Sequence, residues 1–171
     1  RHATNFLEKH QMRTIVYPGT FDPIHCGHID IAERASKLFD KIVFVIAVNT
    51  EKNPLFTPEE RIEMILGATN HIGNVEAHST NGLIAEYARK IEAVALIRGL
   101  RHVSDFEFEF QMATMNHHLN PDVSTLLMVT AENFIHLNST VVKDVARLKG
   151  DISKFVPPIV LQKLKDKFHL S

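Results

Sequence analysis

Short apolar runs alternate with longer stretches of helical period from Arg13 onward, and this alternation limits the folds that are available to the chain. It is typical of a parallel β-sheet whose strands are connected by helices. Most of the runs are continuously apolar, as expected for strands that are covered on both faces. The pattern predicts one α/β domain with an open, doubly wound sheet of five parallel strands. Those strands are expected at residues 14–17, 42–48, 75–78, 94–97 and 125–129.

Helices are predicted between the strands from the spacing of apolar side chains. Ile31, Ala35 and Leu38 lie at positions i, i+4 and i+7, which places them on one helical face. The clearest helix start is at Thr57, a capping residue followed by a proline and two glutamates. Further helices are expected near residues 62–66, 83–91, 105–118 and 141–148, and after residues 157–158.

The first 11 residues are polar and show neither a strand pattern nor a strong helix pattern. Met12 would serve as a natural start. We therefore interpret residues 1–11 as a leader outside the fold, of the kind that an expression vector adds, and residues 12–171 as the single domain.

The charge balance restricts the partners of the chain. It has 19 Lys and Arg against 20 Asp and Glu, a net charge of −1. Neither nucleic acid nor a membrane is therefore an expected partner, and any anion site must be a local cluster. The single cysteine, Cys26, cannot form an internal disulfide, and no apolar stretch has the length of a membrane span or resembles a signal peptide. We expect a cytoplasmic protein.

Two loops are expected to carry the functional site. In doubly wound sheets, ligands bind at the carboxyl ends of the strands, beside the point where the strand order reverses. The relevant loops follow the first and fourth predicted strands, at residues 18–28 and 98–101. Gly19 and Gly27 would let the backbone approach a ligand closely, and the helix that begins near His28 would direct free N–H groups at a phosphate.

Two histidines and two arginines in these loops favour a bound polyanion. His25 and His28 are three residues apart, so both can point the same way and donate hydrogen bonds to phosphoryl oxygens. Alone they would more often be simple helix-start residues. Arg98 and Arg101 add forked, permanently charged donors from the neighbouring loop, and this combination favours the functional interpretation.

Several common sites are excluded by the sequence. The chain contains neither G-x-x-x-x-G-K-[ST] nor G-x-G-x-x-G, so it supports neither a P-loop nucleoside triphosphatase nor a dinucleotide dehydrogenase. Cys26 stands between two histidines, but three such groups within four residues cannot easily surround one tetrahedral ion, and no second cluster follows. We predict no metal ion held by protein ligands alone.

The same residues carry a family resemblance. Residues 17–23, followed by His25-Cys26-Gly27-His28, resemble the [HT]-x-G-H signature of the nucleotidyltransferase superfamily. Residues 56–61, 97–101, 105–109 and 142–146 resemble segments of the phosphopantetheine adenylyltransferase family, in the same order, over about residues 12–168. The resemblance implies a Rossmann-like nucleotidyltransferase fold. It also implies adenylyl transfer from ATP, with Mg²⁺, to 4′-phosphopantetheine, which gives dephospho-coenzyme A and pyrophosphate. A homo-hexamer is implied, and coenzyme A is a candidate feedback ligand.

The resemblance also implies roles for individual residues. The catalytic residues it implies are His28, Lys52 and Arg101. The residues it implies for phosphopantetheine are Thr20, Lys52, Ile84 and Arg98, with Asp22 a lesser candidate for turn geometry or Mg²⁺. The residues it implies for ATP are Thr20, Phe21, His25, His28, Gly99, Leu100, Arg101, Glu109, Phe134, Ile135, His136, Leu137, Asn138, Ser139 and Thr140.

The chain departs from the family in the last of these segments. Relatives carry an aromatic residue, an aliphatic residue and then Ser-Ser-Ser or Ser-Ser-Thr, where this chain has His136-Leu137-Asn138-Ser139-Thr140. Asn is as good a helix cap as Ser, so we expect the anion-binding end of the segment to be preserved. His136 would gain charge as the pH falls below neutrality, which predicts a contribution to acid-side changes in ATP affinity.

Two other functions stay open at this stage. The chain could be a nicotinamide mononucleotide adenylyltransferase or a cytidylyltransferase of the same superfamily, although those should lack the 98–101 and 105–109 segments as they stand here. A catalytically silent nucleotide-binding module is the second alternative. The presence of His28, Lys52, Arg98 and Arg101 together speaks against it.

Overall fold

A computed structural model describes residues 11–48 and 53–170 of the chain. The strands are β1 (Thr14–Gly19), β2 (Lys41–Ala47), β3 (Val75–Thr80), β4 (Ala95–Leu100) and β5 (Ser124–Val129). The helices are α1 (Cys26–Ser36), α2 (Pro58–Ala68), α3 (Ile84–Lys90), α4 (Val103–Leu119), the short 3₁₀ helix η1 (Glu132–Phe134), α5 (Ser139–Arg147) and α6 (Pro158–Phe168).

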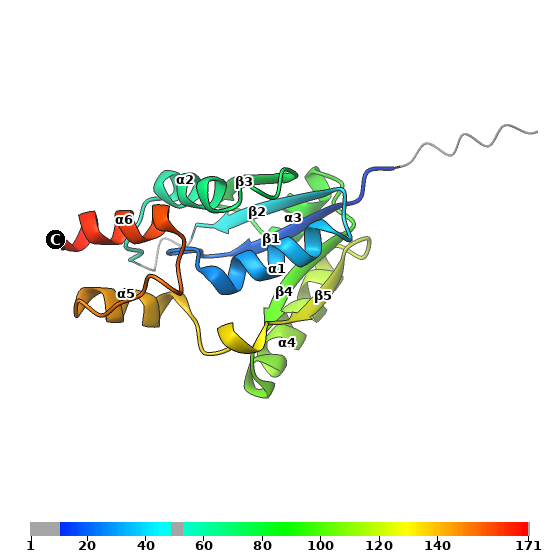
Figure 1. Ribbon diagram of the computed structural model, residues 1–171. Coiled ribbons are helices and arrows are strands. Elements are labelled where there is room, and N and C mark those ends of the chain that lie inside the picture. Colours follow the sequence, from blue (N-terminus) through cyan, green and yellow to red (C-terminus); the bar gives the residue numbers. More distant parts are fainter. Residues whose placement is uncertain (1–10, 49–52, 171) are drawn as a thin grey trace, which may run out of the picture.

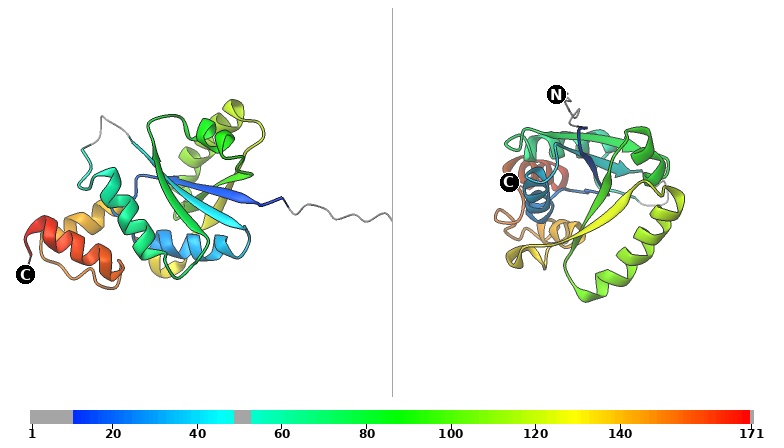
Figure 2. Two further views of the ribbon diagram at one scale, coloured as in Figure 1. Left: turned by 90° about the horizontal axis from the view of Figure 1, so that it is seen from above. Right: turned by 90° about the vertical axis from the view of Figure 1, so that its right-hand side faces the viewer.

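The five strands form one parallel sheet with the order β3-β2-β1-β4-β5, and helices cover both of its faces (Figure 1, Figure 2). The order reverses at β1, so the predicted doubly wound α/β sheet of five parallel strands is confirmed. Helices α5 and α6 lie beyond the carboxyl ends of β1 and β2 in Figure 1.

The sheet opens between β1 and β4. These two strands are paired only at Ile15 with Ala95 and at Val16 with Leu96. In contrast, β1 pairs with β2 as far as Gly19, and β4 pairs with β5 as far as Leu100. The carboxyl halves of β1 and β4 therefore diverge and leave a crevice at the reversal point, where ligands of doubly wound sheets bind.

The strand ends differ from the prediction at this crevice. Arg98, Gly99 and Leu100 belong to β4 and not to the loop after it, because β5 continues to pair with β4 through these residues. Similarly, β1 continues through Gly19, because β2 pairs with it as far as that residue. The arginine at position 98 is therefore held by a strand rather than by a loop.

Alternate residues of the central strands pack into two cores. Ile15, Ile42 and Phe44 belong to the larger core, which includes buried side chains of α1, α2, α5 and α6. Val16 and Val43 belong to the smaller core, to which α3 contributes. As predicted, β1 and β2 are buried on both faces. The edge strand β5 differs, because its residues are only partly covered.

The predicted start of α2 is confirmed in detail. The Thr57 hydroxyl accepts a hydrogen bond from the Glu60 backbone N–H at 3.1 Å, and the Glu60 carboxylate accepts one from the Thr57 N–H at 2.8 Å. Pro58 occupies the first helical turn, where its missing N–H costs nothing. Within residues 11–48 and 53–170, no helix is both long and apolar enough to cross a membrane.

Candidate active site

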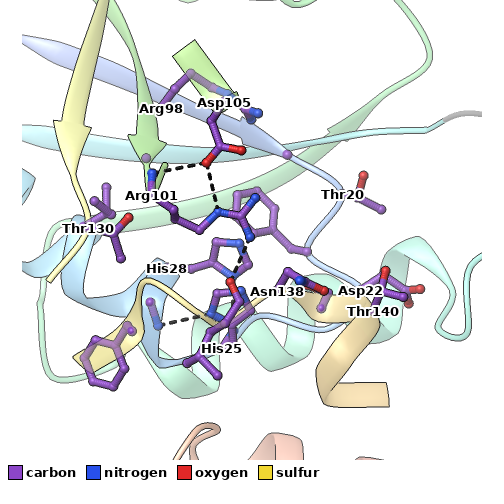
Figure 3. A pocket seen from close by; sticks show the side chains of 18 of the residues that line it. Thr20, Asp22, His25, His28, Arg98, Arg101, Asp105, Thr130, Asn138 and Thr140 are labelled. Atoms are coloured by element: carbon purple, nitrogen blue, oxygen red, sulfur yellow. Dashed lines mark hydrogen bonds and ion pairs between the residues drawn. The ribbon is translucent and has the colours of Figure 1, made fainter. Parts of the chain in front are cut away.

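A cavity of about 610 Å³ occupies the crevice between β1 and β4 (Figure 3). It is bounded by the ends of both strands, the start of α1, the first turns of α4, and the segment that leads into α5. Its lining includes most of the side chains that the sequence indicated. These are Thr20, Phe21, His25, His28, Arg98, Gly99, Arg101, Glu109, Phe134, Leu137, Asn138, Ser139 and Thr140.

Four of the predicted residues lie outside the cavity lining, and one lies outside the described part of the chain. Leu100, Ile84, Ile135 and His136 are not among the lining residues. Ile84 packs against the smaller core, and the ring of His136 contacts Phe155 edge-on, with 5.5 Å between ring centroids. Lys52 lies outside the described residues.

The glycines of the first loop make room for protein side chains. A Cβ atom on Gly19 would lie 2.9 Å from the ring of Phe21, and one on Gly27 would lie 3.0 Å from the imidazole of His25. Phe21 has a φ of 48°, and its buried ring packs edge-on against His28 at 5.0 Å between centroids. A side chain at either glycine would therefore collide with an aromatic ring that lines the cavity.

His25 and His28 form a stacked pair at the start of α1. Their ring centroids are 3.7 Å apart. Nδ1 of His25 accepts a hydrogen bond from the Gly27 backbone N–H at 3.1 Å, and Nδ1 of His28 accepts one from the His25 N–H at 3.2 Å. A ring whose Nδ1 accepts and which is neutral carries its proton on Nε2. Both rings therefore offer an Nε2–H donor.

Burial keeps both imidazoles neutral. Burial, with a smaller contribution from the charge of Arg101, lowers the pKa of His25 to about 3. Burial also lowers the pKa of His28 well below its usual value, and His25, Arg98 and Arg101 add to the shift. A neutral imidazole is a hydrogen-bond donor that does not need a counter-ion, which suits a position facing phosphoryl oxygens.

Arg98 is fixed on three sides. Its Nε donates to Oε2 of Glu109 at 3.0 Å, and one Nη donates to Oε1 of the same carboxylate at 2.8 Å. The other Nη donates to the carbonyl of Pro18 at 2.6 Å. Burial alone would lower the pKa of Arg98, but the hydrogen bonds and charge of Glu109 outweigh it and raise the pKa. The guanidinium thus stays charged, and some of its N–H groups remain for a ligand.

Arg101 connects the end of β4 to the segment before α5. Its guanidinium donates to the Leu137 carbonyl at 2.9 Å and lies 3.4 Å from the carboxylate of Asp105. Asp105 also accepts from the backbone N–H groups of Arg101 and His102, both at 3.2 Å. Burial would raise the pKa of Asp105, but these hydrogen bonds and the Arg101 charge outweigh burial and lower it.

The N-terminus of α5 faces the same cavity. The Asn138 side chain caps the helix by accepting from the Val141 N–H at 2.8 Å, as the sequence predicted. Ser139 donates its hydroxyl to the Pro23 carbonyl at 2.8 Å, which ties α5 to the loop after β1. The first N–H groups of the helix remain available to an anion.

A buried carboxylate organises the loop after β1. Asp22 is 2% exposed and accepts from the backbone N–H groups of Leu55 and Phe56, both at 2.9 Å. It also accepts from Lys143 of α5 at 2.8 Å. Nearby, the buried Arg61 donates to the Thr20 carbonyl at 2.9 Å. These contacts favour turn geometry over metal binding as the role of Asp22.

Sequence reasoning missed two of the charged residues that line the cavity. Asp105 appeared only within a segment of resemblance, and Lys143 appeared there as well, without a role. The signal for Lys143 was present in its position, because it follows Thr140 by three residues and therefore lies on the same face of the predicted helix.

The fold and the site together define a nucleotidyltransferase, with an [HT]-x-G-H helix start at the reversal point of a doubly wound sheet. The family model described as cytidylyltransferase-like matches residues 16–145. A crystal structure described as a nicotinate-nucleotide adenylyltransferase from Vibrio parahaemolyticus has the same fold, with a TM-score of 0.66 and 17% identity over 90% of this chain and 99% of that one.

Two curated relatives are much more similar in sequence. The phosphopantetheine adenylyltransferase of Caldanaerobacter subterraneus subsp. tengcongensis is 48% identical over 160 residues, which is 94% of this chain and 100% of the relative. That of Heliobacterium modesticaldum is 48% identical over 157 residues, 92% of this chain and 94% of the relative. The chain belongs to the phosphopantetheine adenylyltransferase family.

Proposed function

We propose that this protein transfers the adenylyl group of ATP to 4′-phosphopantetheine, giving dephospho-coenzyme A and pyrophosphate, a step of coenzyme A biosynthesis. Family membership supports this reaction. The structural observation that carries the proposal is the arrangement of His25 and His28. Backbone N–H groups hold both neutral rings through Nδ1, so each ring offers an Nε2–H donor. Both lie in one cavity with two charged arginines.

The reaction needs no protein nucleophile. An oxygen of the acceptor phosphate attacks the α-phosphorus of ATP, a new P–O bond forms, and the P–O bond to the β-phosphate breaks, which releases pyrophosphate. The protein has to align the attacking and leaving oxygens and stabilise the charge that develops between them. The cavity residues suit this task because each is held by other protein groups before a substrate binds.

We assign the acceptor phosphate to Arg98 and the α-phosphate to His28. The Glu109 carboxylate and the Pro18 carbonyl direct the Arg98 guanidinium, and its remaining N–H groups would hold the attacking phosphate in place. The Nε2–H of His28 would donate to an α-phosphoryl oxygen and bind more strongly as that oxygen gains charge. Lys52, outside the described residues, stays a predicted catalytic residue and a predicted contact to 4′-phosphopantetheine.

Magnesium is proposed to enter with ATP. Within residues 11–48 and 53–170, no group of three or more His, Cys, Asp or Glu side chains could hold a metal ion. The cavity carboxylates of Asp22, Asp105 and Glu109 are engaged by cations and backbone N–H groups. The site therefore fits an ion that is bound by phosphate oxygens and water, whose charge would offset that of the triphosphate.

The test is an acceptor assay. The protein is incubated with ATP and Mg²⁺ and either 4′-phosphopantetheine or nicotinamide mononucleotide, and with a cytidylyltransferase substrate pair, and pyrophosphate is measured. We expect release only with ATP and 4′-phosphopantetheine. Release with another pair would favour the alternative nucleotidyltransferases, and ATP binding without release from any pair would favour the silent module.

We also propose that the protein is a homo-hexamer. Helix α4 and strand β5 expose apolar side chains, including Phe106, Phe110, Met115 and Val129, which are 48%, 59%, 54% and 67% exposed. An exposed apolar surface of this kind supports association of further copies. Light scattering after size exclusion would measure the mass.

We further propose that the protein is cytoplasmic and that coenzyme A binds it as a feedback ligand. Competition between coenzyme A and ATP for binding would test the second proposal.

A further inference from the structure

Arg61 is a buried cation outside the cavity lining, and neither the resemblance nor the proposed mechanism gives it a role. It lies in α2 and is only 2% exposed. Its Nε donates to the Thr57 carbonyl at 3.3 Å, and one Nη donates to the Thr20 carbonyl at 2.9 Å. Within residues 11–48 and 53–170, no carboxylate forms an ion pair with it. A buried guanidinium without such a partner is costly, so packing alone does not explain an arginine here.

The hydrogen bond from Arg61 sets the orientation of the Thr20–Phe21 peptide, which is trans. The C=O and N–H of a trans peptide lie in one plane and point in opposite directions. Because the Thr20 carbonyl is directed at α2, the Phe21 N–H is directed away from α2. In the described part of the chain, no protein group accepts a hydrogen bond from this N–H. Thr20 and Phe21 both line the cavity, so the N–H is a candidate donor to a ligand there.

The backbone of Phe21 has an unfavourable conformation that this orientation requires. Its φ is 48°, in the left-handed region that bulky side chains rarely adopt. Turning the Thr20–Phe21 peptide by about half a turn would bring this φ to a negative value and remove the strain. It would also place the Thr20 carbonyl where the N–H now lies, and a carbonyl oxygen repels an anion. The hydrogen bond from Arg61 opposes the turn, because the turn would break it.

We propose that Arg61 is a positioning residue that holds the Thr20–Phe21 peptide with its N–H directed into the cavity, as a donor to a phosphoryl oxygen of ATP. This inference rests on the proposed adenylyl transfer, in which Thr20 and Phe21 are expected contacts of ATP. Arg61 touches no substrate and acts only through the peptide. A backbone N–H that is fixed before ATP binds needs no reorganisation when negative charge develops on the phosphoryl oxygen.

The experiment measures kcat and the orientation of the peptide in the same variant. Arg61→Met removes the donors and keeps an unbranched apolar side chain in α2. Its kcat for dephospho-coenzyme A formation should fall about 10- to 100-fold, somewhat less than the loss that follows removal of a transition-state donor itself. A crystal structure of the variant should show the Thr20 carbonyl turned away from α2. A role confined to the stability of α2 would leave this peptide as it is.

Two control variants separate this role from general effects. Thr57→Ala removes the side-chain cap of α2 but keeps the Thr57 carbonyl that accepts from Arg61. Arg89→Met removes another arginine that donates to a distant backbone carbonyl, that of Leu119, outside the cavity lining. Both variants should keep the kcat and the peptide orientation of the wild type.

If Arg61→Met does not fold, Arg61→Lys carries the test, because lysine keeps the buried charge and has a single donor atom. Its kcat should follow the peptide, unchanged where Nζ holds the Thr20 carbonyl and lowered where the peptide has turned. In either variant, a turned peptide with the kcat of the wild type would overturn the inference. A lowered kcat with an unturned peptide, or an Arg61→Met variant that changes neither, would overturn it too. The proposed function fails separately, if the wild type forms no dephospho-coenzyme A.

Discussion

Lowering the pH should destabilise this protein through the histidine pair at the start of α1. His25 is 4% exposed, its Nδ1 accepts from the Gly27 N–H, and its ring stacks on His28. A proton on Nδ1 would break that hydrogen bond and place a charge in a buried site that already contains Arg101. These are the reasons that the pKa of His25 falls to about 3 in the folded protein.

The size of the effect follows from the two pKa values. In the unfolded chain His25 has a pKa of about 6.5, so between about pH 6.5 and pH 3 the unfolded state binds a proton that the native state does not. Stability therefore falls as the pH falls through this window. From pH 7 to pH 5, His25 alone should remove about 2 kcal/mol from the free energy of unfolding. His28, whose pKa is also lowered, acts in the same direction.

Urea denaturation at pH 7 and pH 5 measures the effect, with wild type and His25→Asn at one protomer concentration. Asparagine retains a side-chain acceptor for the helix cap and cannot titrate. We expect the loss of stability between the two pH values to be smaller in the variant by about 2 kcal/mol. His118→Asn, at an exposed position of α4, should leave the wild-type difference unchanged. An equal pH dependence in His25→Asn and wild type would refute the assignment of a buried, neutral His25.

Three further predictions concern single side chains. His28→Ala should lower kcat by about 10²- to 10³-fold and change ATP affinity much less, because its donor acts mainly on the transition state; near-normal turnover would remove His28 from the mechanism. Glu109→Gln should raise KM for 4′-phosphopantetheine about tenfold more than KM for ATP, because Glu109 directs Arg98. Titration of each substrate in turn measures both KM values, and an equal rise in the two would contradict this role of Glu109. Thr57→Ala should lower the free energy of unfolding by about 1 kcal/mol through loss of the α2 cap, with kcat/KM unchanged, as urea denaturation and steady-state kinetics would show.

The fold could be predicted because its signal is local. Each strand and helix has its own periodicity, and the cap at Thr57 lies within four consecutive residues. The ends of the strands could not be predicted, because they depend on pairing with distant segments. Arg98 and Leu100 are in β4 only because β5 continues alongside them, and no pattern within residues 98–100 indicates that pairing.

The sequence predicted which side chains of the candidate site donate hydrogen bonds. It did not predict which other residues hold those side chains in place. The sequence placed His25 and His28 three residues apart at a helix start, which was enough to indicate a donor pair. It did not indicate that Arg98 is held by Glu109, or that Asp22 meets Lys143, which is 121 residues further along the chain. Such ion pairs join segments that meet only in the folded chain, so they have no periodicity in the sequence.

These pairs change how the cavity attracts its substrates. Among the described residues, Arg98, Arg101 and Lys143 each face a carboxylate, so the three cations of the lining are balanced by three anions. The described lining therefore supplies no net positive charge for two polyanionic substrates, in a chain whose own net charge is −1. What this part of the lining offers a phosphate is a set of oriented N–H donors, from the paired cations, the neutral histidines and the N-terminus of α5. Donors of this kind act over hydrogen-bond distances and are screened less by salt than separated surface charges. Selectivity for phosphates at defined positions then follows from the geometry of the crevice rather than from its total charge.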